Sequence, residues 1–278
     1  MPQLEVVPVH SDPARPDVWE QLRAAADRTA RAEPHLASQM NAVILSHSDL
    51  AAALGFQIAR KLGDAELGAM SVREICRDAH EADPSIVAAA AADLRAVAER
   101  DPAIKSLLQP FLYFKGFQAL QGHRVAHWLW NQGRDALAFH FQSRMSELFQ
   151  VDIHPAARLG SGLFLDHGTG IVIGETAVVG DDVSMLHAVT LGGTGAQRGD
   201  RHPKIGKGVL LGAGAKVLGN ITVGDYAKVA SGSVVLKPVP AGCTVAGVPA
   251  RLVNCPTGEA PARTMDHTLA DVVYDFVI

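Results

Sequence analysis

Aliphatic residues recur at every sixth position through the second half of the chain. The positions are Ile153, Leu159, Leu165, Ile171, Ala177, Val183 and Val189, followed by Ile205, Leu211, Val217, Val223, Val229 and Val235. A fixed six-residue repeat is typical of a parallel β-helix, in which each hexad forms one short strand and a turn. Three hexads close one triangular coil, and inward side chains of successive coils stack on one another. A series of short antiparallel strands would give irregular spacing, so we predict a parallel β-helix over residues 151–253.

The repeat is interrupted once, and the interruption predicts a protruding loop. Val189 and Ile205 are sixteen residues apart, which exceeds a multiple of six by four. We therefore expect residues 193–204 to leave the coil, and loops on rigid scaffolds often carry function. An inert solvated loop is the alternative. The glycines at 192–195 do not form a nucleotide-binding fingerprint, because the GxxxxGK[ST] pattern and a following helix are absent.

The first half of the chain has a helical period, so we place a domain boundary near residue 150. Residues 17–150 are expected to form an all-helical domain, with helices over 34–45, 48–62, 71–79, 84–100, 111–130 and 134–149 after a first helix capped by Asp17. Packing and oligomer assembly are the expected roles of this domain. Residues 1–16 are expected to be a loose leader, and residues 254–278 a flexible tail. The fold class is therefore α+β.

Composition narrows the cellular setting. The net charge of −4 argues against binding to nucleic acid or to a membrane surface. Cys76, Cys243 and Cys255 have neither CxxC nor metal spacing, and their odd number fits a reducing cytosol better than a disulfide framework. No apolar run reaches the roughly 18 residues of a membrane helix, and the first ten residues do not resemble a signal peptide. We expect a cytoplasmic protein.

Four histidines accompany the coils: His154, His167, His187 and His202. An imidazole with a pKa of about 6.5 suits proton transfer near neutrality, and a carboxylate on its second nitrogen fixes the tautomer. Asp152 lies fifteen residues before His167, so the two can share one edge of adjacent coils. Asp166 would point the other way along a strand, so Asp152 is the expected orienting partner. A surface or packing role remains the alternative for any one of these histidines.

A metal site is a second interpretation of the same histidines. Successive histidines are separated by 13, 20 and 15 residues, which does not supply an HxxxxH pair. We therefore expect no metal.

Seven short segments resemble one known family. They are residues 115–120 (KGFQAL), 127–133 (HWLWNQG), 151–157 (VDIHPAA), 165–170 (LDHGTG), 189–195 (VTLGGTG), 199–205 (GDRHPKI) and 246–250 (AGVPA). With these segments the chain resembles the bacterial serine O-acetyltransferases of the hexapeptide-repeat acyltransferase superfamily. The resemblance implies a left-handed β-helix and transfer of the acetyl group of acetyl-CoA to the hydroxyl of L-serine, the first committed step of cysteine biosynthesis.

The same resemblance implies roles for individual residues. His167 matches the general base, oriented by Asp152. Asp101 and Asp166 match the residues that bind the substrate ammonium, and Arg201 and His202 match those that bind its carboxylate. These residue types suit a zwitterion, because carboxylates attract the ammonium and an arginine fork binds a carboxylate in a bidentate manner.

Co-substrate and partners follow from the resemblance as well. Gly193, Ala213, Lys228 and Ser231 match positions that line acetyl-CoA in a groove between adjacent β-helices, although Ser231 stands where the family often has alanine. No cofactor is implied beyond this co-substrate. The family implies a hexamer built as a dimer of trimers, inhibition by cysteine, and docking of the tail ending in Ile278 onto O-acetylserine sulfhydrylase.

Two other functions fit part of the pattern. One is an O-acetyltransferase acting on a sugar or on homoserine, which would share the β-helix and the histidine base. The other is a scaffold without activity that only anchors the sulfhydrylase through the tail. A panel of acceptors separates the first from a serine acetyltransferase, and release of a thiol in the presence of serine separates the second.

Overall fold

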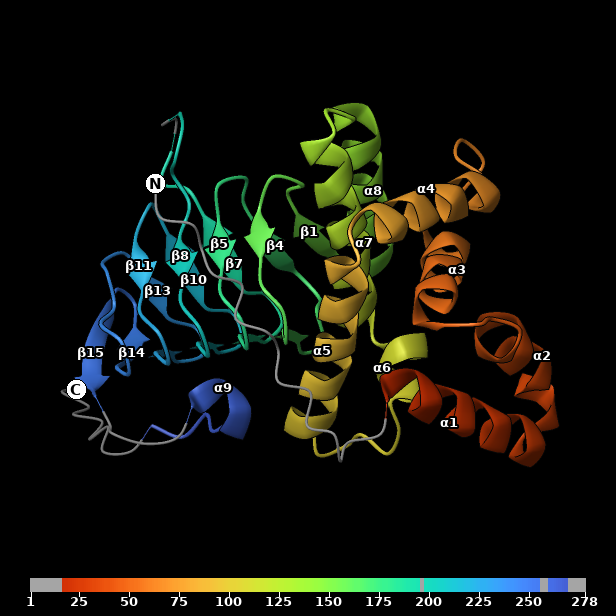
Figure 1. Ribbon diagram of the computed structural model, residues 1–278. Coiled ribbons are helices and arrows are strands. Elements are labelled where there is room, and N and C mark those ends of the chain that lie inside the picture. The colour runs from red at the N-terminus through yellow and green to blue at the C-terminus, as the bar shows by residue number, and fades with distance from the viewer. Residues whose placement is uncertain (1–16, 196–197, 256–259, 270–278) are drawn as a thin grey trace.

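The N-terminal half of the computed structural model is helical, as the periodicity predicts (Figure 1). The structure describes residues 17–195, 198–255 and 260–269. Within the helical part, the elements are α1 (Val18–Ala32), a 3₁₀ turn η1 (Pro34–Leu36), α2 (Ala37–Met40), a π-helical turn η2 (Asn41–Leu45), α3 (Leu50–Leu62), α4 (Ala69–Ala82), α5 (Ser85–Arg100), α6 (Leu108–Tyr113), α7 (Lys115–Asn131) and α8 (Asp135–Phe149).

Helix boundaries differ from the prediction where a local hydrogen bond or a backbone bend decides them. The cap of α3 is Asp49, whose carboxylate accepts the amide N–H of Ala52 at 2.8 Å, one residue after the serine expected to serve as the cap. Helix α4 begins at Ala69, two residues before the expected start. The helix expected over 111–130 is two helices, because Phe114 takes an extended conformation between α6 and α7.

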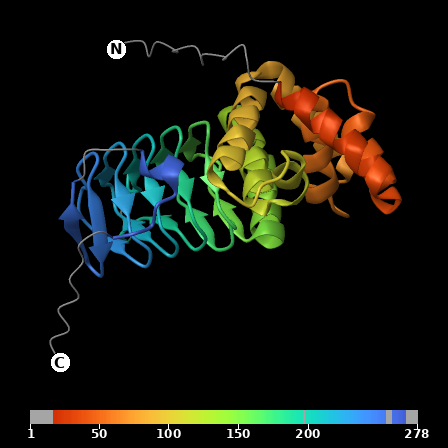
Figure 2. The same ribbon diagram turned by 90° about the horizontal axis from the view of Figure 1, so that it is seen from below.

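In the described part of the second half, fourteen short strands pair in parallel and a fifteenth, β15, pairs antiparallel with the last of them, so the predicted β-helix is confirmed (Figure 2). The strands are β1 (Val151–Ile153), β2 (Arg158–Leu159), β3 (Phe164–Leu165), β4 (Ile171–Ile173), β5 (Val178–Val179), β6 (Ser184–Met185), β7 (Thr190–Gly192), β8 (Lys204–Ile205), β9 (Leu210–Leu211), β10 (Lys216–Leu218), β11 (Thr222–Val223), β12 (Lys228–Val229), β13 (Val234–Val235), β14 (Thr244–Gly247) and β15 (Ala250–Asn254). They form three sheets, in the orders β1-β4-β7-β10-β13, β11-β8-β5-β2 and β15-β14-β12-β9-β6-β3.

The first coil is two residues longer than the next one. Ile153 pairs with Ile173, twenty residues further on, whereas Ile173 pairs with Leu191 after eighteen. The two extra residues lie in the corner between β3 and β4. Leu165 in β3 pairs with Met185 in β6, and Val172 in β4 pairs with Thr190 in β7, so the first coil has two more residues between these pairs than the next coil has. The aliphatic repeat therefore changes phase at this corner, although every position of the repeat except the half-buried Leu159 is buried.

This phase change corrects the predicted size of the loop. Ile173 and Val179 are six residues apart, whereas their partners in the following coil, Leu191 and Ile205, are fourteen apart. The insertion is thus eight residues and not four. It falls in the expected segment, between β7 and β8.

Helix α7 joins the two halves by close packing. A Cβ added to Gly116, at its start, would overlap the carbonyl oxygen of Leu165 in β3. Arg100 at the end of α5 is buried and donates to the hydroxyl of Ser184 at 3.1 Å, in β6. Figure 1 shows α5, α7 and α8 beside the first coil, and α1–α4 farther from it. The contacts of α5 and α7 hold the coil with β3 against the helical domain.

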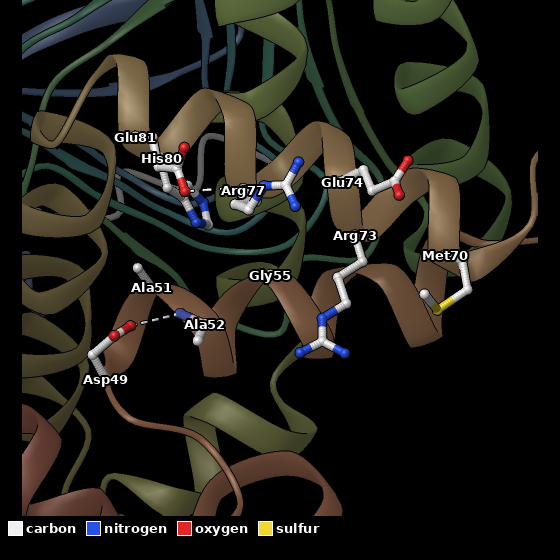
Figure 3. Close-up of a pocket in the computed structure, with 10 residues that line it drawn as sticks. All are labelled: Asp49, Ala51, Ala52, Gly55, Met70, Arg73, Glu74, Arg77, His80 and Glu81. Carbon is white, nitrogen blue, oxygen red and sulfur yellow. Dashed lines mark hydrogen bonds and ion pairs between the residues drawn. The ribbon is translucent and has the colours of Figure 1, made fainter.

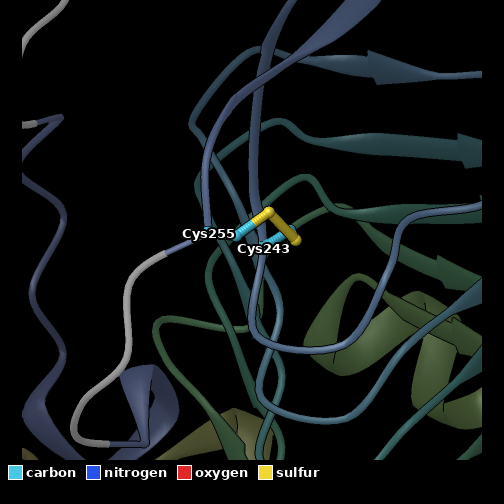
Figure 4. The surroundings of a disulfide bond; sticks show 2 residues. All are labelled: Cys243 and Cys255. Carbon is cyan, nitrogen blue, oxygen red and sulfur yellow. A yellow bond between two sulfur atoms is a disulfide. The ribbon is translucent and has the colours of Figure 1, made fainter.

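The C-terminal end of the β-helix carries a disulfide, which corrects the expectation drawn from the cysteine count. Strands β14 and β15 form an antiparallel hairpin, and Cys243 and Cys255 directly flank it (Figure 4). The hairpin brings their Cα atoms to 4.0 Å, and the two sulfurs are bonded. An odd number of cysteines does not reveal such a pairing, because it depends on how strands return upon one another.

Part of the segment expected to be a flexible tail is ordered against the body. Helix α9 (Pro261–Thr264) packs on α5, and the carbonyl of Ala262 accepts the Ser184 hydroxyl at 2.9 Å. The leader, residues 1–16, and the terminal Ile278 lie outside the described residues.

A cavity of about 490 Å³ lies between α3 and α4, away from the candidate residues of the β-helix (Figure 3). It is lined by Asp49, Ala51, Ala52, Gly55, Met70, Arg73, Glu74, Arg77, His80 and Glu81. Across the described ranges, none of the helices has both the length and the apolar content needed to cross a membrane.

Candidate active site

His167 occupies the lengthened corner between β3 and β4. Its backbone has a φ of 58°, the left-handed region, so the chain turns sharply after Asp166. The amide N–H of Gly168 donates to the Asp166 carbonyl at 2.7 Å and closes the turn. The ring is largely exposed, with 72% of the side chain accessible, and it packs edge-on against His187 of the next coil, with ring centres 5.8 Å apart. An exposed imidazole at a corner is able to reach a ligand.

Asp166 lies on the same side as His167, contrary to the alternation of a strand. His167 Nε2 is 3.8 Å from Asp166 Oδ1. The left-handed residue breaks the alternation, and this is why the expectation that Asp166 points away is wrong. Burial raises the pKa of Asp166, the nearby Asp101 carboxylate raises it further, and His167 opposes both effects. The structure thus brings together Asp101, Asp166, His167 and His187, which we call the acid cluster.

Asp152 is held by a different partner. Its Oδ1 accepts the side-chain amide of Gln142, in α8, at 2.6 Å. The described residues include no hydrogen bond or ion pair between Asp152 and His167 within one chain. Asp152 lies in β1, on the strand that pairs with β4, and its charge acts on His154. Its role in orienting the base therefore stays a prediction.

Arg201 and His202 lie at the other end of β4 from His167. The Arg201 guanidinium donates to Glu175 Oε2 at 2.6 Å, and this hydrogen bond lowers the pKa of Glu175. His202 is buried, and burial followed by the charge of Arg201 lowers its pKa. A neutral imidazole next to a guanidinium can bind an anionic oxygen.

Thr176 connects this corner to the loop. Its Oγ1 accepts the amide N–H groups of Arg201 and His202, each at 3.0 Å, and lies 2.9 Å from His202 Nδ1. Lys204, which ends the loop, donates to the carbonyl oxygens of Thr176 at 2.9 Å and His202 at 2.7 Å. We call His154, Glu175, Thr176, Arg201 and His202 the loop cluster.

Gly174 makes room for the loop cluster. A Cβ added there would overlap the ring of His202 at Cδ2 and Nε2. Sequence reasoning identified the loop but missed Gly174, Glu175 and Thr176, which receive it one coil earlier. These three residues form no recognisable motif in the sequence. The number of residues in each coil decides which corner lies next to the loop, and that number was not known from the sequence.

Two of the expected acetyl-CoA positions continue the corner column that starts at His167. Gly214 donates to the carbonyl of His187 at 2.9 Å, and Gly232 donates to that of Ala213 at 2.7 Å. Ala213 and the exposed Ser231 therefore stack above His187 in successive coils. A groove ligand lying along this column would reach His167.

The other two expected positions lie elsewhere. Gly193 is at the start of the loop, where an added Cβ would lie 3.7 Å from both Arg201 and His202. Lys228 is in β12, and its ammonium donates to the carbonyl of Thr268 at 2.6 Å and lies 3.9 Å from Asp266. The segment after α9 thus covers one of the positions that the resemblance assigns to acetyl-CoA.

Comparisons with known proteins assign the chain to a family. Residues 18–122 match the family described as "Serine acetyltransferase, N-terminal", and residues 202–237 match "Bacterial transferase hexapeptide (six repeats)". The serine acetyltransferase of Escherichia coli strain K12 is 52% identical over 259 residues, which cover 93% of this chain and 95% of that protein. The chain belongs to the serine acetyltransferase family.

Solved structures of serine acetyltransferases share the whole architecture. One from Vibrio cholerae has a TM-score of 0.89 and 57% identity, and covers 90% of this chain and 97% of its own. A serine acetyltransferase in complex with cysteine has a TM-score of 0.90 at 51% identity, covering 91% and 98%. The Brucella abortus serine acetyltransferase in complex with coenzyme A has a TM-score of 0.86 at 52% identity, covering 88% and 98%. Family and fold, as the resemblance implied them, are confirmed.

Proposed function

We propose that this chain transfers the acetyl group of acetyl-CoA to the hydroxyl of L-serine, giving O-acetylserine and CoA. The observation that carries the proposal is that the chain presents two complementary clusters, one at each end of β4. One serine is too short to span a strand, so the acid cluster of one chain must face the loop cluster of a neighbouring chain. The acid cluster offers carboxylates for an ammonium beside an exposed imidazole, and the loop cluster offers a guanidinium and a neutral imidazole for a carboxylate. Family membership at 52% identity supports the same substrates.

His167 is the general base of the proposed reaction. It takes the proton from the serine hydroxyl while that oxygen attacks the thioester carbonyl of acetyl-CoA, and CoA leaves as the thiolate. A thioester is already activated, so direct attack in a ternary complex suffices, without a covalent enzyme intermediate and without a metal. Asp152 orients the base, and Asp101 and Asp166 bind the ammonium. A positioned base contributes about 10² to 10⁴ in rate.

Substrate specificity follows from the two charges of serine. Arg201 and His202 bind its carboxylate, and an uncharged acceptor such as a sugar has no group for either cluster. The coenzyme lies along the corner column at Ala213 and Ser231. The resemblance also implies contacts at Gly193 and Lys228, although within one chain the segment after α9 covers Lys228. Complexes of related enzymes with coenzyme A and with cysteine support a coenzyme A site and an amino-acid site.

Assembly and regulation are part of the proposal. We propose that three chains pack through their β-helices and complete each site between neighbours, and that two trimers form a hexamer in the cytoplasm. Cysteine competes in the serine site as a feedback inhibitor. The tail ending in Ile278, which lies outside the described residues, docks on O-acetylserine sulfhydrylase.

The deciding experiment is release of CoA from acetyl-CoA, measured with a thiol reagent, in parallel reactions with L-serine, homoserine, a sugar and no acceptor. Stimulation by serine alone supports the proposal. Release with a sugar or homoserine but not with serine would show a different O-acetyltransferase. An absence of release with every acceptor, from a folded protein that still binds the sulfhydrylase, would leave only the scaffold function.

A further inference from the structure

The ring of His202 is held by hydrogen bonds that fix which nitrogen carries its proton. The backbone N–H of Thr176 donates to His202 Nδ1 at 3.1 Å. A backbone N–H can only donate, so Nδ1 accepts this bond with its lone pair. The neutral ring must therefore carry its hydrogen on Nε2.

The hydroxyl of Thr176 strengthens the same arrangement. Its oxygen accepts the amide N–H groups of Arg201 and His202, each at 3.0 Å, and lies 2.9 Å from Nδ1. The hydroxyl hydrogen has two acceptors in reach, Nδ1 and the Asp200 carboxylate. A proton on Nδ1 would oppose the backbone N–H of Thr176 and would remove one of these two acceptors.

The other edge of the ring lies beside two glycines. An added Cβ on Gly174 would overlap Nε2, and one on Gly193 would lie 3.7 Å from it. The absence of a side chain at Gly174 gives the ring its own space, and the absence of one at Gly193 marks the side from which we expect a ligand oxygen to approach the Nε2–H group. Arg201, next in the chain, places its guanidinium at the same corner, where one nitrogen pairs with Glu175 and the remaining N–H groups can donate to an anionic oxygen.

We propose that Thr176 is a positioning residue that locks His202 in the Nε2–H tautomer, so that His202 serves as a neutral hydrogen-bond donor and never as a second base. This inference rests on the proposed function, because it deepens the role of the carboxylate end of the serine site. To act as a base through Nε2, the ring would have to move its proton to Nδ1, against the N–H and O–H of Thr176. Proton abstraction is thereby reserved for His167.

Two substitutions of His202 separate a donor from a base. The amide nitrogen of glutamine reaches near the place of Nε2, and that of asparagine reaches near the place of Nδ1. His202→Asn should lower kcat/KM for serine by about 10- to 100-fold, mainly through KM, because a hydrogen bond to a charged group is lost. His202→Gln should recover most of this loss. If both variants lost kcat equally, His202 would act as a base and the proposal would be wrong.

Two substitutions of Thr176 test the lock itself. Thr176→Ser keeps the hydroxyl, whereas Thr176→Val removes it at nearly the same size. We expect KM for serine to rise about 10-fold in Thr176→Val, where two loop amides lose their acceptor, and Thr176→Ser to restore it.

A titration of His202 distinguishes a tautomer lock from mere support of the loop. The charges facing the ring are those of Arg201, Lys204, Glu175 and His154, and the Asp200 carboxylate pairs with Lys204 and accepts from the Thr176 hydroxyl. NMR of protein with ¹³C-labelled histidine, with the signal assigned by its loss in His202→Gln, gives the pKa of this ring directly. It should lie below 6.5 in the wild type and in the serine variant, and rise in Thr176→Val, since the hydroxyl donates only to the neutral ring.

An unchanged pKa in Thr176→Val would overturn the proposal. This measurement needs no substrate, so it also separates the two hypotheses. If wild-type protein released no CoA with serine but showed the expected titration, the proposed function would fail and the lock would stand.

Discussion

A single methyl group at Gly174 should disable the carboxylate end of the site. Gly174 directly follows β4 and lies outside the left-handed region, so Gly174→Ala requires no unusual backbone. Its new Cβ would overlap the ring of His202, as described above, and the adjoining Pro203 limits how far the loop backbone can give way. The ring must therefore turn out of its place.

The size of the effect follows from the bonds that the displaced ring gives up. His202 Nδ1 accepts from the backbone N–H of Thr176 at 3.1 Å and lies 2.9 Å from its hydroxyl. Those two contacts hold the ring in place, and a displaced ring can no longer donate to the substrate carboxylate. A hydrogen bond to a charged group contributes about 1.5–3 kcal/mol, which corresponds to about a 10- to 150-fold fall in kcat/KM for serine. Crowding of a packed site should in addition lower the free energy of unfolding by about 1–3 kcal/mol.

Steady-state rates of CoA release and urea unfolding measure the two effects separately. Gly206→Ala is a matched control, because its Cβ would crowd Asp225 at a different corner, away from both clusters. It should cost stability without changing KM for serine. Gly68→Ala, with open space around the new methyl group, should change neither. If Gly174→Ala kept kcat/KM within twofold while Gly206→Ala lost stability, the placement of His202 in the serine site would be wrong.

Three further predictions concern the base, the ammonium site and the disulfide. His167→Ala should lower kcat by about 10² to 10⁴ while serine still binds by calorimetry; near-normal turnover would point to His187 as the base. Burial raises the pKa of Asp166, so KM for serine should rise as the pH falls through that raised pKa, and Asp166→Asn should have a high KM at every pH. A pH-independent KM in the wild type would contradict this ammonium site. Reduction, or Cys243→Ser, should lower the free energy of unfolding by about 3 kcal/mol, because the closed loop spans 12 residues; an unchanged urea midpoint would show that the bond does not constrain the unfolded chain.

The scaffold was predictable because its physical signal is repeated many times. Each coil must bury aliphatic side chains on the next one, so the same residue types return at the same spacing. The phase change at residues 166–170 was not predictable for a related reason. Ile171 and Ile173 are both buried, at 0% and 2% exposure, so a shift of two residues still places an aliphatic side chain in phase.

The sequence indicated which residues belong to the site more reliably than it indicated which of them contact one another. Sequence reasoning found His167, Arg201 and His202, because an imidazole and a guanidinium stand out among small aliphatics. It paired His167 with Asp152, whereas within one chain the nearby carboxylate is that of Asp166, at 3.8 Å. That contact depends on one residue with a positive φ, which is uncommon for any residue other than glycine and is not visible in the sequence pattern.

Length itself marks the chemistry in this protein. A regular coil takes 18 residues, as between Ile173 and Leu191 or between Lys216 and Val234. Two coils that precede the C-terminal hairpin are longer than this. The extra residues of one longer coil carry the acid cluster, and those of the other carry the loop cluster. Stacking of coils favours equal lengths, so we expect extra residues where they serve a function other than stacking. In other proteins with this repeat, counting the residues in each coil would indicate where the active site lies without the use of a sequence motif.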